Sequence, residues 1–150
     1  MLITIYKNSL RYFDLHPKCI IKDGQPVALA RNGYVVHATG PNFFGLFCGW
    51  FESNGIYDKE PIINDKNIPI KIGIYIGENG EFALSEDLFD DSFQRLNPHD
   101  MVCIKDGKIS LCDYSEKDIS FGFVTKSIAC SDNVQYITIL VTNIVMSEDY

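Results

Sequence analysis

The chain has 150 residues, of which 46% are hydrophobic and 22% are charged, and its formal net charge is −7. This length and composition predict one globular domain spanning residues 1–150 and exclude a disordered chain. The acidic balance and the scattered lysine and arginine residues argue against a protein that coats nucleic acid or an anionic membrane, because such proteins cluster basic residues. No stretch of 18 or more apolar residues is present, so we expect no membrane-spanning helix.

The N-terminal region, residues 1–20, contains a weakly alternating stretch, Leu2–Tyr6, that predicts a short edge strand. Residues 8–18 have a mixed pattern, in which Pro17 favours an extended backbone at His16. The N-terminus lacks the basic start and long apolar core of a signal peptide, so we expect synthesis in a cytoplasm. The sequence leaves open whether residues 1–20 fold onto the domain or form an N-terminal arm that orders on binding.

One pattern occurs twice in the chain: an apolar strand, an Asn-Gly or Asp-Gly step, a second strand, a loop and a Phe-Gly step. It occupies Ile21–Ser53 and returns in Met101–Lys126. Asn-Gly and Asp-Gly supply the positive φ values of a type I′ turn, whose twist matches that of the flanking strands. The steps Asn32-Gly33 and Asp106-Gly107 therefore predict two β-hairpins.

The aromatic run at residues 43–51 is apolar on both faces when it is drawn as a strand. Such a strand either lies centrally in the core or has one face against another subunit. A helix is disfavoured because Gly45 and Gly49 would lie in its interior. The candidate interface residues of this run are Phe43, Phe44, Phe47, Trp50 and Phe51.

The middle of the chain combines a polar loop with the most regular strand. Ser53–Pro69 has no hydrophobic period and predicts a long surface loop. Isoleucine recurs at every second residue of Ile70–Ile76, which predicts a strand with one buried face. Glu78–Gly80 predicts a turn into a strand at Phe82–Leu84, and hence a third hairpin.

One helix is predicted, over Ser85–Leu96, because Ser85 can cap it and because Phe89 and Phe93 fall on one face. Val134–Val145 predicts the last strand. These elements make the expected fold class all-β, with mostly antiparallel hairpins in a barrel or sandwich, one short helix and a long surface loop.

The cysteines and histidines show few patterns that predict chemistry. Five cysteines without a C-x-x-C pair favour buried thiols in a reducing compartment. Cys103 and Cys112 flank a predicted turn and can face each other across a hairpin, which leaves a disulfide open. The three histidines lack metal-binding spacing, although a distant pairing of Cys112 with His37 is left open.

The clustered carboxylates at residues 86–91 are interpreted as the solvated face of the predicted helix and not as a cation site. No nucleophile elbow, phosphate-binding glycine loop or dinucleotide fingerprint is present. We therefore predict a protein that is not an enzyme, with no catalytic residue, no metal ligand and no cofactor.

The two-copy pattern resembles the small β-rich virion proteins of tailed bacteriophages, especially capsid decoration or cement proteins. It is carried by PVALARNGYVVHATGPNFFGLF at residues 26–47, by MVCIKDGKISLCDYSEKDISFGFV at residues 101–124, and by the final strand VQYITILV. The resemblance implies a structural protein that binds and stabilises the outer capsid surface, with the major capsid protein or another virion protein as its partner. It further implies a homo-oligomer, with a trimer among the options, on the virion surface after synthesis in the host cytoplasm.

Two other hypotheses remain open from the sequence. One is a tail, neck or head-fibre component of a virion. The other is a small hydrolase or ligand-binding β-barrel that uses a Cys/His site, for which an unusually reactive cysteine would be the sign.

Overall fold

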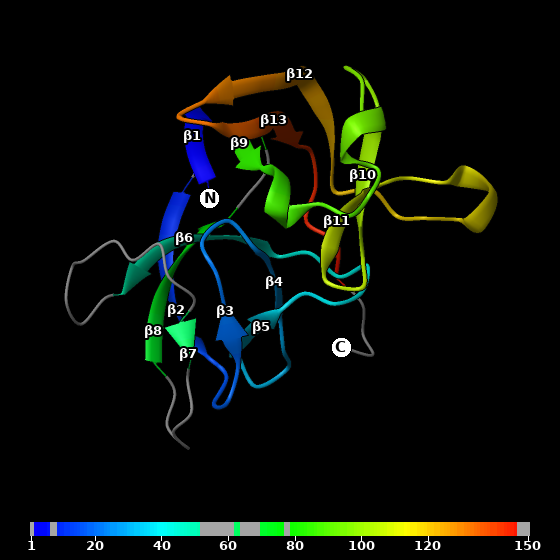
Figure 1. Cartoon of the computed structure of the whole chain (residues 1–150). Helices are drawn as coiled ribbons and strands as arrows, with labels where there is room; N and C mark the ends of the chain where they lie inside the picture. The colour runs from blue at the N-terminus through cyan, green and yellow to red at the C-terminus, as the bar shows by residue number, and fades with distance from the viewer. Residues whose placement is uncertain (1, 7–8, 52–61, 64–69, 77–78, 147–150) are drawn as a thin grey trace.

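A computed structural model describes residues 2–6, 9–51, 62–63, 70–76 and 79–146. The fold is all-β, as predicted, and consists of a five-stranded closed barrel and a six-stranded sheet (Figure 1). All but residues 62–63 of the predicted loop Ser53–Pro69 lie outside the described residues. Within the described part of the chain, no helix is long and apolar enough to cross a membrane.

The barrel closes through its strands in the order β2-β5-β4-β6-β8. Their bounds are β2 (Ser9–Leu15), β4 (Pro26–Leu29), β5 (Val35–His37), β6 (Gly45–Phe51) and β8 (Ile70–Ile76). The pairs are antiparallel except for β2 and β5, which pair in parallel at Leu15 and Val35. A separate two-stranded ladder joins β3 (Ile20–Ile21) to β7 (Ile62–Ile63).

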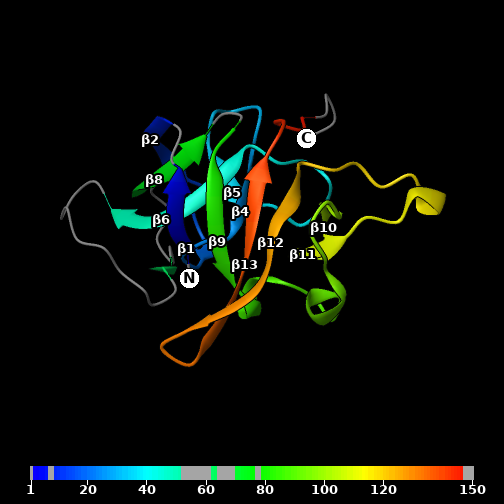
Figure 2. The same cartoon turned by 90° about the horizontal axis from the view of Figure 1, so that it is seen from above.

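The six-stranded sheet has the order β1-β9-β13-β12-β10-β11, so β1 and β11 are its outermost strands (Figure 2). Their bounds are β1 (Leu2–Tyr6), β9 (Glu81–Ser85), β10 (Met101–Lys105), β11 (Lys108–Leu111), β12 (Gly122–Ser131) and β13 (Val134–Val141). Every neighbouring pair in it is antiparallel.

One antiparallel ribbon runs through both sheets. Leu2 pairs with Leu84 in the six-stranded sheet, and Leu15 pairs with Ile70 in the barrel. The predicted third hairpin is therefore wrong, because β8 and β9 lie in different sheets and each pairs with a strand from the N-terminal region. The described residues of that region form β1, β2 and part of the β3 ladder.

The two predicted hairpins are confirmed, but their turns differ. Asp106 and Gly107 have φ values of 50° and 79°, as a two-residue type I′ turn requires, and they join β10 to β11. In the other hairpin only Gly33 has a positive φ, of 85°, and its N–H donates to the Ala30 carbonyl at 2.9 Å. The Ala30 N–H donates to the Tyr34 carbonyl at 2.8 Å, so the turn itself is residues 31–33 and needs only one left-handed position, which glycine fills. The type I′ turn predicted at Asn32-Gly33 is therefore wrong.

Two hydrophobic cores hold the fold together. Of the predicted isoleucine face, Ile72 and Ile74 are buried in the barrel interior, while Ile70 and Ile76 are partly buried against this core. The second core lies between the barrel and the six-stranded sheet, where the Phe43 ring stacks on Phe121 with centroids 4.2 Å apart. The Phe43 backbone also exchanges two hydrogen bonds with Val145, of 2.6 and 2.8 Å, which tie the end of the described chain to the barrel.

The predicted helix over Ser85–Leu96 is wrong. The segment forms two 3-10 turns, η1 (Glu86–Leu88) and η2 (Phe93–Arg95), although Phe89 and Phe93 are both buried and in ring contact. The Asp90 side chain binds the N–H and hydroxyl of Ser92, a local pattern that competes with a helix. The Asp90 N–H instead donates to the Ile109 carbonyl of β11 at 3.0 Å.

Candidate functional site

The hairpin of β10 and β11 places two cysteines on its outer face. Val102 belongs to the core, so strand alternation puts its neighbour Cys103 on the other face. Cys103 lies opposite Ser110, and the Cys112 N–H donates to the Met101 carbonyl at 2.9 Å. Cys112 is therefore the diagonal neighbour of Cys103 on the same face.

The two thiols are free, hydrogen-bonded to each other and largely buried, with exposures of 2% for Cys103 and 9% for Cys112. The hydrogen bond from Cys103 lowers the pKa of Cys112, and one from Ser120 adds to this effect against the opposing effect of burial. The same hydrogen bond raises the pKa of Cys103, and burial raises it further. Cys112 is thus the better nucleophile of the pair.

A loop that begins after Cys112 is tied to β10 by an ion pair. The Lys105 Nζ lies 2.8 Å from the Asp118 carboxylate, whose Oδ2 also accepts the Asp113 N–H at 2.7 Å. This loop includes η3 (Tyr114–Glu116) and is the yellow segment that projects from the sheet in Figure 1. The hydrogen bond between Lys105 and Asp118 raises the pKa of Lys105 and lowers the pKa of Asp118, so both side chains stay charged near neutral pH.

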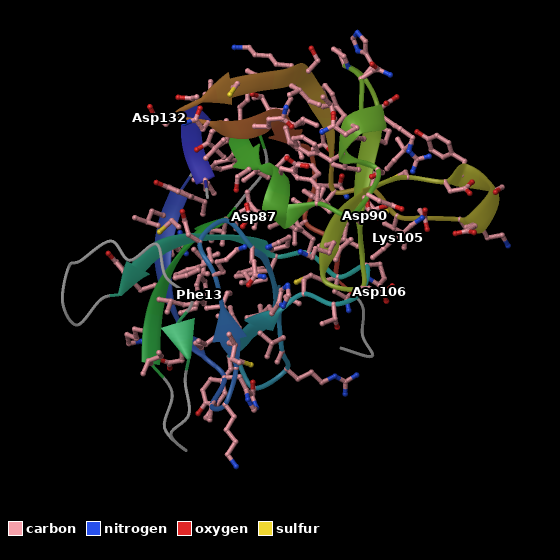
Figure 3. All side chains as sticks on the ribbon, viewed as in Figure 1. Phe13, Asp87, Asp90, Lys105, Asp106 and Asp132 are labelled. Carbon is pink, nitrogen blue, oxygen red and sulfur yellow. The ribbon has the colours of Figure 1, made fainter. Side chains whose placement is uncertain are left out.

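A pocket of about 510 Å³ lies between this loop and the η2 segment. Its lining includes Asp90, Arg95, Lys105, Ser110, Cys112 and Tyr114. Figure 3 shows Asp90 and Lys105 on neighbouring segments at this end of the sheet. Burial raises the pKa of Asp90, but hydrogen bonds from Ser110 and Ser92 outweigh it and leave the pKa below its usual value. The pocket therefore combines cationic and anionic groups with one partly reachable thiol.

His37 lies at the other end of the hairpin. Its Nε2 donates to the Gly107 carbonyl at 3.0 Å, which joins the barrel to the β10–β11 turn. Burial lowers the pKa of His37, against the effect of that hydrogen bond, so the ring is neutral at pH 7. The four residues of β11 separate Gly107 from Cys112, which puts the two Cα atoms about 17 Å apart in an extended strand. The structure thus places His37 and Cys112 apart.

The acidic residues at 86–91 do not form the solvated face of a helix. Asp87 accepts hydrogen bonds from Lys22 and Ser85, and it lies where the barrel meets the six-stranded sheet (Figure 3). Burial raises its pKa, but these hydrogen bonds lower it to about 2. Asp90 is half-buried, while Asp91 is exposed. Two of these carboxylates therefore have structural partners, which the sequence did not indicate.

The predicted interface residues lie in or beside β6, and their exposures differ. Phe43 and Phe47 are fully buried within the chain, Phe43 in the core between the two sheets and Phe47 in the barrel. Phe44 is half-buried and makes an edge contact with Phe13. The side chains of Trp50 and Phe51 lie outside the described part of the structure. Phe44 packs against the barrel core but keeps part of its surface exposed, whereas Phe43 and Phe47 are out of a partner's reach.

Sequence reasoning missed a set of exposed apolar side chains in the N-terminal region. Ile5, Leu10, Tyr12 and Ile20 are four of the seven large hydrophobic residues that are exposed in the described structure. Leu10 and Tyr12 alternate along β2, so they share the outer face of the barrel wall. The alternation was present in residues 9–15, but their mixed composition concealed it.

Among the described residues, no group of three or more histidine, cysteine, aspartate and glutamate side chains could hold a metal ion. Two features of the described structure are candidate sites. One is the thiol pair with its pocket, and the other is the set of exposed apolar residues on β1 and β2. No family model matches this chain, and no curated protein matches it either.

Proposed function

We propose that this chain is a non-enzymatic structural protein that docks on the outer surface of a phage capsid. The observation that carries the proposal is the group of exposed apolar side chains on the first two strands, Ile5, Leu10 and Tyr12. We call these three residues the N-terminal patch. Residues of this kind are enriched where a surface meets a protein partner.

The position of β1 supports a docking role. β1 is the outermost strand of the six-stranded sheet, and β9 pairs with its inner edge. An outermost strand presents backbone N–H and C=O groups that a strand of another protein can extend. Ile5 lies on this strand, so apolar contact and strand addition would act at the same place.

The outer wall of the barrel carries the other two residues of the N-terminal patch. Phe13 and Leu15 of β2 point into the barrel core, which leaves Leu10 and Tyr12 on the outside. A rigid barrel presents these side chains without ordering a flexible segment, which lowers the entropic cost of binding. Many copies on a repeating capsid lattice would then stabilise it through contacts that are individually weak.

The proposal is tested with particles of the encoding virus that lack this protein. Purified chain is added, and bound protein is measured after sedimentation of the particles. We expect the wild-type chain to bind. Tyr12→Glu and Ile5→Lys should each bind about tenfold more weakly, because each places a charge in the apolar contact.

Matched control variants are available at two other exposed positions. Tyr114 and Ile119 are also exposed, but they lie in the loop between β11 and β12. Tyr114→Glu and Ile119→Lys should bind as the wild type does. Circular dichroism of all four variants checks folding, which exposed substitutions usually leave intact. Equal binding by all four variants, or no binding by the wild type, would contradict the proposal.

A further inference from the structure

We propose that Cys103 and Cys112 form a reactive dithiol that low-molecular-weight disulfides, such as oxidised glutathione, convert reversibly into an intramolecular disulfide. The proposal rests on three observations: the two cysteines share one face of a hairpin, their thiols are in contact, and only one of them borders a pocket. It is independent of the docking role proposed above.

The hairpin geometry brings the two sulfur atoms within reach of each other. Cys103 and Cys112 are diagonal neighbours on one face of the hairpin, and their thiols are hydrogen-bonded to each other. Diagonal positions are about 7–8 Å apart, slightly beyond the usual Cα separation in a disulfide, so the strand ends must approach when the bond forms. A bond formed in this way is more easily reduced than a structural disulfide.

The pocket decides which cysteine reacts first. Cys112 lines the pocket and retains some exposure, whereas Cys103 is 2% exposed and is absent from the lining. Arg95 and Lys105 line the pocket together with Asp90, Asp91 and Asp113, so charges of both signs face a bound disulfide. Cys112 is therefore the attacking thiol, and Cys103 is the resolving thiol.

The reaction balances in two exchange steps. The Cys112 thiolate attacks one sulfur of oxidised glutathione, the bond between the two glutathione sulfurs breaks, and one glutathione leaves as a thiol. The Cys103 sulfur then attacks the Cys112 sulfur and displaces the second glutathione, which takes up the Cys103 proton. Two protein thiols are oxidised to a disulfide, and one oxidised glutathione is reduced to two thiols.

The neighbouring groups favour this order. The thiol of Cys103 donates a hydrogen bond to the Cys112 sulfur, which stabilises the Cys112 thiolate. Lys105 contributes in the same direction, while Asp118 opposes it. Cys103 keeps its proton until Cys112 has been converted to the mixed disulfide.

The test uses the full chain with the two more accessible cysteines, Cys19 and Cys130, replaced by serine. Folded protein is incubated with oxidised glutathione, the remaining thiols are alkylated, and the products are identified by intact-mass and peptide mass spectrometry. We expect a Cys103–Cys112 disulfide with no retained glutathione, and its loss when reduced glutathione is added. Cys48 is the internal control. It is buried in β6, so it should be alkylated only after the protein has been unfolded.

Two single variants separate the steps. Cys103→Ser should retain glutathione on Cys112, because the resolving thiol is missing. Cys112→Ser should take up no glutathione and form no disulfide, because Cys103 is not reachable. Circular dichroism confirms that each variant is folded. The proposal is overturned if the folded protein with both cysteines shows no disulfide under conditions that oxidise the unfolded chain, or if Cys103→Ser carries no adduct.

Discussion

Asp87 is a residue at which segments distant in the sequence meet. Its carboxylate accepts hydrogen bonds from Lys22, in the turn that follows β3, and from Ser85, at the end of β9. Its backbone carbonyl accepts a hydrogen bond of 2.8 Å from Lys108, at the start of β11. Asp87 therefore connects the barrel side of the molecule to two parts of the six-stranded sheet.

The lowered pKa of Asp87 predicts an acid-dependent contribution to stability. The folded-state pKa is about 2, below the ordinary value of 3.8, so the contribution is present above pH 3.8 and is lost as the pH falls toward 2. Asp87→Asn should lower the free energy of unfolding at pH 7 by about 0.5–1 kcal/mol, since solvent screens this half-exposed pair.

Urea unfolding of the wild type and Asp87→Asn between pH 7 and pH 2 measures this effect. The difference between the two proteins should narrow as the pH drops below 3.8. Asp91→Asn is the control, because Asp91 is an exposed carboxylate in the same segment. A difference between wild type and Asp87→Asn that stays constant across the range would contradict the assignment.

The structure leaves no room for a Cβ atom at Gly45. A Cβ at Gly45 would lie 2.4 Å from the Tyr75 carbonyl oxygen and 2.7 Å from the Ile74 Cγ2. Because the first of these contacts is with backbone, the β6–β8 pairing would have to shift. Gly45→Ala should therefore destabilise the protein by about 1–3 kcal/mol in urea unfolding.

Gly40 is the matched control for Gly45. A Cβ at Gly40 has no atom within 4 Å. Gly40→Ala should change the free energy of unfolding by no more than about 0.5 kcal/mol. If both variants were equally stable, the close approach of β6 and β8 at Gly45 would be disproved.

At the scale of elements, the segment of η1 and η2 protects the outermost strand β11. Phe89 pairs with Ile109, the Asp90 N–H donates to the Ile109 carbonyl at 3.0 Å, and the Leu111 N–H donates to the Ser92 Oγ at 3.0 Å. These bonds cover backbone groups that an outermost strand would otherwise present to another chain. On β1, the one such bond among the described contacts is from the Leu2 N–H to the Asp23 carboxylate at 3.2 Å.

Ser92 and Ser115 allow a matched test of this cover. In both, the N–H and hydroxyl bind the side chain of the aspartate two residues earlier, at 2.9 and 2.6 Å. Ser92 is buried and accepts the Leu111 N–H, whereas Ser115 is exposed. Ser92→Ala should lower the free energy of unfolding by about 1 kcal/mol, because it leaves the partly buried Leu111 N–H without its acceptor.

Ser115→Ala should lie within about 0.5 kcal/mol of the wild type in the same unfolding measurement. Hydrogen exchange then locates the effect. Exchange of the Leu111 amide should accelerate in Ser92→Ala and not in Ser115→Ala. Equal exchange rates at Leu111 in the two variants would show that Ser92 does not hold the edge of β11.

The elements that the sequence predicted correctly are those fixed by local chemistry. The Asp106-Gly107 step specified the β10–β11 hairpin, because both residues accept positive φ. The alternating isoleucines specified the buried face of β8. The helix over Ser85–Leu96 failed because Asp90 and Ser92 bond locally and the segment pairs with β11, neither of which hydrophobic spacing reveals.

The site was predicted only in part, for the same reason. The proximity of Cys103 and Cys112 followed from their positions around one turn. The pocket did not, because it joins the η2 segment to a loop some 20 residues later, and the N-terminal patch did not, because its exposure depends on the barrel. Features made by non-local pairing need the fold, whereas turn chemistry does not.

At the scale of the whole molecule, the long ribbon of β1, β2, β8 and β9 couples the barrel to the six-stranded sheet. Residues 2–15 therefore contribute one strand to each sheet, and residues 70–85 do the same. The Phe43–Phe121 stack and the Phe43–Val145 backbone pair join the sheets again on the C-terminal side. A molecule connected in this way can present the N-terminal patch as a rigid surface.

The central claim is that the protein acts by docking on a capsid, and its copy number in virus particles tests this most directly. Under the proposal a phage encodes this chain, so purified particles of that phage are digested, and the chain is quantified by mass spectrometry against the major shell protein. A decoration role predicts copies in simple proportion to the capsomers, because each lattice position offers the same surface. Absence of the chain from particles would contradict the claim, and a handful of copies per particle would contradict decoration in favour of a tail or neck position.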